Sequence, residues 1–173
     1  MVRSHQVVSL TILALSDNGY GIARVGSDTI YVKHALPKER CQVEIVKRVK
    51  DGYVGRTMKW ERKDPGRMES SCAFTSDCGS CHWMDIAYER QLELKKQLVE
   101  GWLKQASLSL KVHDVLGMKE PYGYRNKVII AFQRDEKHRV CAGFYEEFSH
   151  RIVPFSQCPL HEGGLDAIID TNL

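Results

Sequence analysis

The sequence contains no long hydrophobic run. Its longest early apolar stretch spans residues 7–16, is interrupted by Ser9 and Thr11, and is too short to cross a bilayer. The start of the chain also lacks the basic, apolar and small-residue order of a secretory signal peptide. We therefore expect a cytoplasmic protein that makes no membrane contact. Because disulfides are disfavoured in that compartment, clustered cysteines are expected to be metal ligands or redox centres.

The chain has little net charge, with 25 Lys and Arg residues against 22 Asp and Glu residues among 173, or +3. With 43% hydrophobic and 27% charged residues, it has the composition of a globular protein of one or two small domains. The distribution of charge is uneven, because residues 47–67 contain eight basic residues and only three acidic ones. We select five of these as candidate RNA contacts: Lys47, Arg48, Lys59, Arg62 and Lys63.

The first 62 residues contain several short segments rich in β-branched residues. Leu10 and Ile12 share one face of residues 6–15 at a spacing of two. Turn residues separate the further candidate strands, which are residues 22–25, 29–36, 41–50 and 53–60. About five short strands with tight turns predict a small closed or nearly closed β-barrel. Barrels of this size often present a basic face to nucleic acid, although a solvated strand pair with mixed charge explains the same residues.

Cysteine is concentrated in one place. Cys72, Cys78 and Cys81 have the spacing C-x5-C-x2-C, and the short turn of the last pair directs both thiols toward one centre. A four-ligand site needs another thiolate, and Cys158, followed directly by Pro159, is the best candidate. The two other cysteines, Cys41 and Cys141, lie in predicted strands, where we expect buried packing.

Two kinds of centre suit these cysteines. Zinc takes four thiolates, or three together with His82 or His161, whereas an iron–sulfur cluster takes four cysteines. The usual structural zinc pattern has two CxxC pairs, and the single pair in this chain favours a cluster modestly. The C-x3-C-x2-C pattern of radical enzymes is not matched, and reversible redox sensing is a further possibility without a specific signal.

The second half of the chain contains both helical and strand-like segments. Residues 85–106 predict a helix with an apolar stripe through Tyr88, Leu92, Val99 and Trp102, for which we expect core packing. Three strands are then expected at residues 127–134, 139–146 and 150–155, followed by the beginning of a helix. The fold class we predict is mainly β with one or two helices (α+β).

The order of these motifs resembles the bacterial RNA uracil-5-methyltransferases, most closely the branch that modifies 23S ribosomal RNA. The motifs are the C-x5-CGSCHWM segment, YGYRNKV, GFYEEFSHRIV and CPLHE, and the resemblance runs from about residue 6 to 165. It implies a chain of four parts: a TRAM-like, OB-type RNA-binding barrel at 1–62, a linker and cysteine segment at 63–83, a helix belonging with a methyltransferase domain at 84–118, and an incomplete β-rich central domain at 119–173.

The resemblance also implies ligands and partners. A [4Fe-4S] cluster is expected on Cys72, Cys78, Cys81 and Cys158. RNA, most specifically 23S rRNA, is the expected partner of a monomeric protein. The segment near the RNA is expected to include Tyr124, Arg125, Asn126 and Lys127.

The catalytic half of that family is not visible in the sequence. No glycine-rich S-adenosylmethionine (SAM) loop follows a strand, and no late catalytic cysteine or paired base is recognisable. We therefore expect no catalytic residue and no Rossmann-like C-terminal domain in this chain, inactivity on its own, and SAM binding only in a full-length enzyme. Two other functions stay open: a stand-alone RNA-binding module, and a zinc-stabilised interaction protein without catalysis.

Overall fold

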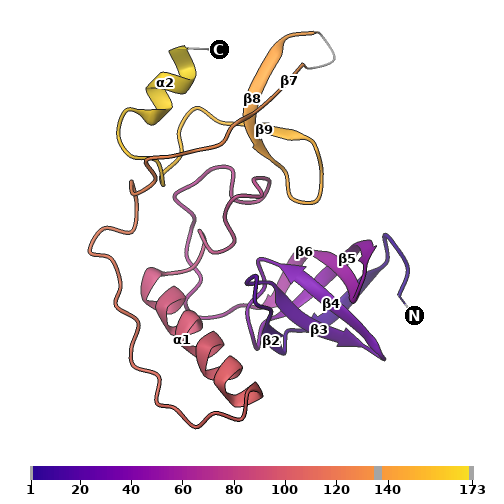
Figure 1. The fold of residues 1–173 in the computed structure, drawn as a ribbon. Coiled ribbons are helices and arrows are strands. Elements are labelled where there is room, and N and C mark those ends of the chain that lie inside the picture. Colours follow the sequence, from indigo (N-terminus) through magenta and orange to yellow (C-terminus); the bar gives the residue numbers. More distant parts are fainter. Residues whose placement is uncertain (1, 135–137, 172–173) are drawn as a thin grey trace. The chain divides into compact units, whose positions relative to one another are not determined.

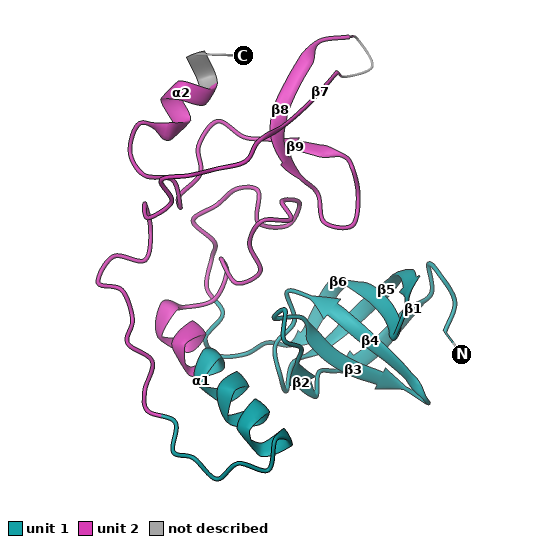
Figure 2. Ribbon diagram, viewed as in Figure 1, with its two compact units in different colours: residues 1–67, 94–112 teal, residues 68–93, 113–173 magenta. Residues whose placement is uncertain are grey.

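The computed structural model describes residues 2–134 and 138–171, which form two compact units (Figures 1 and 2). Unit 1 contains residues 1–67 and 94–112, and unit 2 contains residues 68–93 and 113–173. The strands are β1 (Val7–Thr11), β2 (Ala14–Leu15), β3 (Gly21–Val25), β4 (Asp28–Lys33), β5 (Arg40–Val49), β6 (Gly52–Arg62), β7 (Ala131–Arg134), β8 (Val140–Tyr145) and β9 (Ile152–Pro154). The helices are α1 (Tyr88–Gln105) and α2 (Leu165–Thr171).

The strands of unit 1 form a closed barrel. Their order in the sheet is β1-β5-β6-β4-β3-β2, and all neighbours are antiparallel except the parallel pair β4 and β6. Only Ile12 and Leu13 separate β1 from β2, so one stretch of chain pairs with β5 on one side and β3 on the other. The backbone N–H of Leu13 donates to the Ile22 carbonyl at 2.7 Å and continues this closure. The predicted small barrel is therefore confirmed.

The barrel core follows from the alternation of apolar residues along each strand. Cys41, Val43 and Ile45 alternate along β5 and are completely buried, while the residues between them are more exposed. On β4, Ile30 and Val32 behave in the same way. Cys41 is thus a packing residue, as predicted, and its burial raises the pKa of its thiol to about 11.

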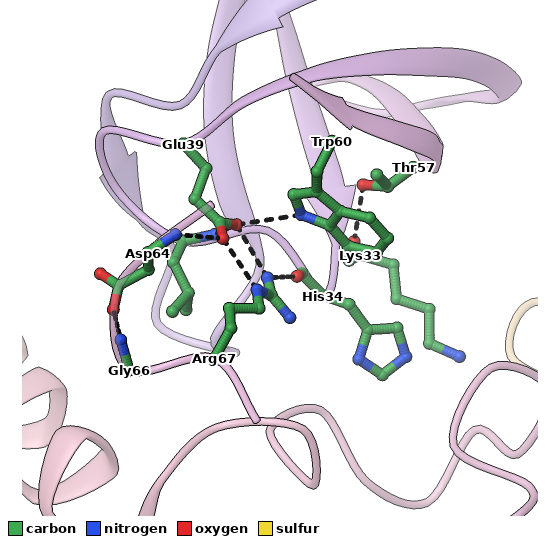
Figure 3. A network of polar contacts seen from close by, with 9 residues as sticks. Lys33, His34, Glu39, Thr57, Trp60, Asp64, Gly66 and Arg67 are labelled. Atoms are coloured by element: carbon green, nitrogen blue, oxygen red, sulfur yellow. Dashed lines mark hydrogen bonds and ion pairs between the residues drawn. The ribbon is translucent and has the colours of Figure 1, made fainter. Parts of the chain in front are cut away.

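A buried ion pair joins the barrel to the segment that follows it (Figure 3). The Arg67 Nε and Nη2 atoms donate to the two carboxylate oxygens of Glu39 at 2.8 and 2.7 Å, and the two side chains are 8% and 0% exposed. The backbone N–H groups of Leu36 and Asp64 also donate to Glu39, at 2.8 and 2.9 Å. The Trp60 indole N–H donates to the same carboxylate at 3.3 Å. The Glu39 side chain therefore connects β6 and the segment after it to the loop before β5.

Helix α1 does not use its apolar stripe as the sequence predicts. Leu94 is its buried residue, whereas Val99 and Trp102 are 37% and 45% exposed. The Trp102 indole N–H donates to Asp17 at 2.7 Å. The prediction that the whole apolar stripe of α1 packs into a core is therefore wrong among the described residues. The apolar residues of the barrel are buried against one another and leave Val99 and Trp102 exposed.

Unit 2 is built around a small antiparallel sheet in the order β7-β8-β9. Residues 69–87 contain turns and isolated bridges in place of regular helix or strand, and they carry three of the cysteines. The sheet-rich chain with two helices agrees with the predicted α+β class. Within the described residues, no helix has the length and apolar character needed to cross a membrane.

Candidate metal centre and nucleic-acid interface

Four cysteines of unit 2 line a single cavity. Cys72, Cys78 and Cys81 come from the irregular segment before α1, and Cys158 comes from the loop after β9. All four are partly buried and none forms a disulfide. The rest of the lining is mostly apolar and includes Phe74, Met84, Phe144, Val153 and Phe155. The structure thus brings the remote cysteine to the three local ones inside a largely apolar shell.

Backbone pairing holds the CxxC turn against the sheet. Cys78 forms an antiparallel bridge with Glu146, and the Gly79 N–H donates to the Tyr145 carbonyl at 3.0 Å. A Cβ atom at residue 79 would lie 2.8 Å from that carbonyl oxygen, so the turn fits at this position only with glycine. The Ser80 N–H donates to the Cys78 sulfur at 3.4 Å, which is the kind of contact that orients a thiolate ligand.

A separate network fixes the loop of Cys158. Asp166, at the start of α2, accepts the backbone N–H of Cys158 at 3.1 Å with one carboxylate oxygen. Its other oxygen lies 2.5 Å from Nδ1 of His161, whose side chain is fully buried. The His161 ring in turn packs edge-on against Phe144 and Phe155, which stack on each other at 4.7 Å. No sequence pattern indicates the role of Asp166, because this contact exists only once α2 folds back on the loop.

The environment of the thiols favours a positively charged occupant. Burial raises the pKa of the Cys81 thiol to about 11; the positive charge of Arg125 opposes this rise, and the three other thiols of the cavity add to it. Burial likewise raises the pKa of Cys158. Four thiolates would repel one another in this shell without a cationic centre, so binding of such a centre must release protons.

The donor set of the cavity consists of sulfur alone. His82 pairs with Glu147 at 3.6 Å and His161 pairs with Asp166, and neither histidine is among the lining residues. Across residues 2–134 and 138–171, no three His, Cys, Asp or Glu side chains form a group that could hold one metal ion. Sulfur ligands of this kind suit zinc and iron–sulfur clusters alike.

The predicted basic residues of the barrel occupy two places on the β5–β6 ribbon. Lys47 and Arg48 lie beside Val54 and Tyr53 at one end, while Lys59 lies farther along β6, about 17 Å from Val54 at the usual rise per residue. All three are exposed, and Arg48 and Lys59 have no hydrogen-bond or ion-pair partner among the described residues. The charges of Arg48 and Lys59 are available to phosphate groups.

Three other basic residues of this region serve the barrel itself. Arg62 donates from Nε to the Lys38 carbonyl at 2.9 Å, and Lys63 lies 5.5 Å from the centre of the Trp60 ring. Arg67, which the sequence places in the same basic stretch, is withdrawn from the surface by Glu39. Arg48 and Lys59 thus have no partner among the described residues, whereas these three basic residues contact the barrel. The composition of the basic stretch does not reveal this difference.

The predicted RNA segment of unit 2 divides in a similar way. Tyr124 is 49% exposed and Lys127 is exposed, whereas Arg125 is partly buried. The Arg125 backbone bridges to His161 in the Cys158 loop, and its charge acts on Cys81 and Cys158. Arg125 therefore lies beside the loop that carries Cys158, although it does not line the cavity.

No protein-family model matches the chain. The chain is 34% identical over 171 residues to an uncharacterized RNA methyltransferase of Halalkalibacterium halodurans, an alignment covering 97% of this chain and 37% of the relative. A second uncharacterized RNA methyltransferase, from Gloeobacter violaceus, is also 34% identical, with coverages of 95% and 36%. The chain thus spans little more than a third of the length of these curated relatives.

The fold is also similar to a solved structure. The Pyrococcus abyssi tRNA (uracil-54, C5)-methyltransferase, crystallised with S-adenosyl-L-homocysteine, matches with a TM-score of 0.58 and 22% identity. The match covers 93% of this chain and 35% of that one. The described units therefore have the fold of part of that enzyme.

Proposed function

We propose that this chain is the RNA-binding and iron–sulfur part of a SAM-dependent methyltransferase that forms 5-methyluridine in RNA. The observation that carries the proposal is the convergence of Cys72, Cys78, Cys81 and Cys158 on one largely apolar cavity. Similarity to proteins named RNA methyltransferases over nearly the whole chain supports the RNA and methyl-transfer parts.

The residues of the cavity fit a [4Fe-4S] cluster. Such a cluster takes four cysteine thiolates, and the cavity supplies four thiols, an apolar shell and a backbone N–H directed at one sulfur. When bound, the cluster links the segment before α1 to the loop after β9, and it contributes its binding energy to the folding of unit 2. Zinc held by the same four thiolates is the alternative, and the single CxxC pair of the chain favours the cluster over it.

The chain's own residues would hold the RNA. Arg48 and Lys59 offer unpaired charges to backbone phosphates, and Lys47 lies beside Arg48 on the same strand. Tyr124 exposes an aromatic ring on which an unstacked base can lie, with Lys127 nearby in sequence to contact phosphate. A uracil must leave its stack before its C5 atom can be methylated, so a surface that holds the flanking nucleotides serves the reaction. We assign no catalytic residue to the described part of the chain.

The substrate we propose is 23S rRNA, with tRNA as the second candidate because the similar solved enzyme acts on tRNA uracil-54. The test is methyl transfer from labelled SAM by the complete product of the gene, using purified 23S rRNA and tRNA in parallel. Formation of 5-methyluridine in the rRNA, identified by mass spectrometry, supports the proposal. Labelling of tRNA alone reverses the substrate assignment, and RNA binding without methyl transfer to either supports the stand-alone RNA-binding module.

A further inference from the structure

We propose that Arg125 is a positioning residue of the four-cysteine site, where its positive charge offsets the negative charge of the thiolate-bound centre, while the neighbouring Tyr124 faces the RNA. This inference rests on the proposed function, since it requires an iron–sulfur cluster in the cavity. It assigns two adjacent residues of one short segment to two different sites.

Backbone hydrogen bonds attach this segment to the loop of the remote cysteine. The Gly123 N–H donates to the Pro159 carbonyl at 2.9 Å, and the Arg125 N–H donates to the Leu160 carbonyl at 2.8 Å. The Arg125 carbonyl in turn accepts the Glu162 N–H at 2.9 Å. Residues 123–125 therefore run beside residues 159–162, which directly follow Cys158 in the sequence.

The surroundings of the Arg125 side chain leave its charge uncompensated. The side chain is partly buried, and no described carboxylate forms an ion pair with it. Its backbone N–H is held by the Leu160 carbonyl, two residues after Cys158, so its positive charge lies close to the loop that carries this thiol. A half-buried guanidinium without a carboxylate is costly unless another anion balances it, and a cluster held by four thiolates carries net negative charge.

The neighbouring side chain faces elsewhere. Along an extended backbone, successive side chains point to opposite sides, and Tyr124 is 49% exposed next to the partly buried Arg125. The RNA contact and the cluster contact thus come from one short segment but lie on different surfaces.

Reduction of the cluster adds a negative charge, which a nearby guanidinium stabilises.

The experiment compares cluster and RNA properties of four forms: wild type, Arg125→Gln, Arg125→Lys and Tyr124→Ala. Each chain is reconstituted anaerobically with iron and sulfide, and its reduction potential, its rate of iron loss in air and its affinity for an rRNA fragment are measured. We expect Arg125→Gln to lower the potential and to lose iron several times faster than wild type. Arg125→Lys should restore both values, because it keeps the charge. RNA affinity of loaded Arg125→Gln should stay within about twofold of wild type.

For Tyr124→Ala we expect a change in RNA affinity and none in the cluster. Loss of a stacked base should weaken RNA binding by about fivefold or more, with potential and iron retention unchanged. Wild-type potential and iron retention in Arg125→Gln, with RNA affinity falling as in Tyr124→Ala, would overturn the inference. Equal loss of the cluster in Arg125→Gln and Arg125→Lys would overturn it too, since charge would then not be the cause. A wild-type chain that binds no cluster would instead defeat the proposed function itself.

Discussion

Arg67 holds the buried carboxylate of Glu39 through two parallel hydrogen bonds of 2.8 and 2.7 Å, directly before the chain leaves unit 1 (Figure 3). The Arg67 guanidinium also lies 4.9 Å from the centre of the Trp60 ring. Because both charged groups are removed from water, each depends on the other for compensation. The pair fixes residues 63–67 against the barrel, at the end of the first segment of unit 1.

Replacement of Arg67 by Met should destabilise unit 1 by about 3–5 kcal/mol, because it leaves the Glu39 carboxylate buried without a counter-charge. The double variant Glu39→Gln/Arg67→Met should recover part of this loss. Urea unfolding followed by tryptophan fluorescence measures both values. Arg56→Ala is the matched control: Arg56 pairs with Glu44 at 2.9 Å on the exposed surface, so its removal should cost no more than about 1 kcal/mol. Equal losses in Arg67→Met and Arg56→Ala would contradict the structural role of the buried pair.

The stability of unit 1 should fall in acid because of Glu39. Burial by itself would raise the pKa of this carboxyl, but its hydrogen bonds from Arg67, Asp64 and Leu36 outweigh burial and hold the pKa below the ordinary 4.5. A lowered folded-state pKa contributes stability above the unfolded-state value, and this contribution is lost as pH falls through the folded-state value. Thermal unfolding between about pH 7 and about pH 3 should therefore show a smaller decline in Glu39→Gln than in wild type. Parallel declines would show that Glu39 is not a source of the acid sensitivity.

Cys158→Ser should abolish stable cluster binding, because the cavity then offers three thiolates and loses its connection to the loop after β9. Iron content after anaerobic reconstitution measures this directly. Cys141→Ser is the matched control, since Cys141 donates to the Gln133 carbonyl on β7 and does not line the cavity. Full iron content in Cys158→Ser, or equal loss in Cys141→Ser, would remove Cys158 from the ligand set.

RNA affinity should decrease steeply with salt, because phosphate contacts release bound counterions. Arg48→Ala and Lys59→Ala should each reduce the slope of log affinity against log salt by about 1, since both residues are unpaired among the described residues. Arg56→Ala should have a smaller effect, because Arg56 already pairs with Glu44. Fluorescence anisotropy with a labelled rRNA fragment at about 50–300 mM salt provides the slopes. Identical slopes in all forms would exclude β5 and β6 from the interface.

The sequence predicts those features that depend on local patterns. Alternation along residues 41–45 predicts the buried face of β5, and the chemistry of a four-ligand site identifies Cys158 from its residue type. Contacts made only by closure of the fold leave no such pattern. Glu39 and Arg67 meet only when the barrel strands between them in the sequence have paired, and Arg125 lies beside the Cys158 loop because its backbone pairs with that loop far along the chain. The apolar stripe of α1 is a case where a local pattern predicts too much. Its periodicity correctly indicates an amphipathic helix, but it cannot indicate whether another element covers Val99 and Trp102.

The central claim is that four thiolates hold one iron–sulfur cluster, and its most direct test is a metal and sulfide count on the wild-type chain purified and reconstituted without oxygen. We predict a brown protein with about four iron and four sulfide per chain and a broad absorbance band near about 400 nm. A colourless protein that retains about one zinc per chain, with no acid-labile sulfide, would contradict the claim.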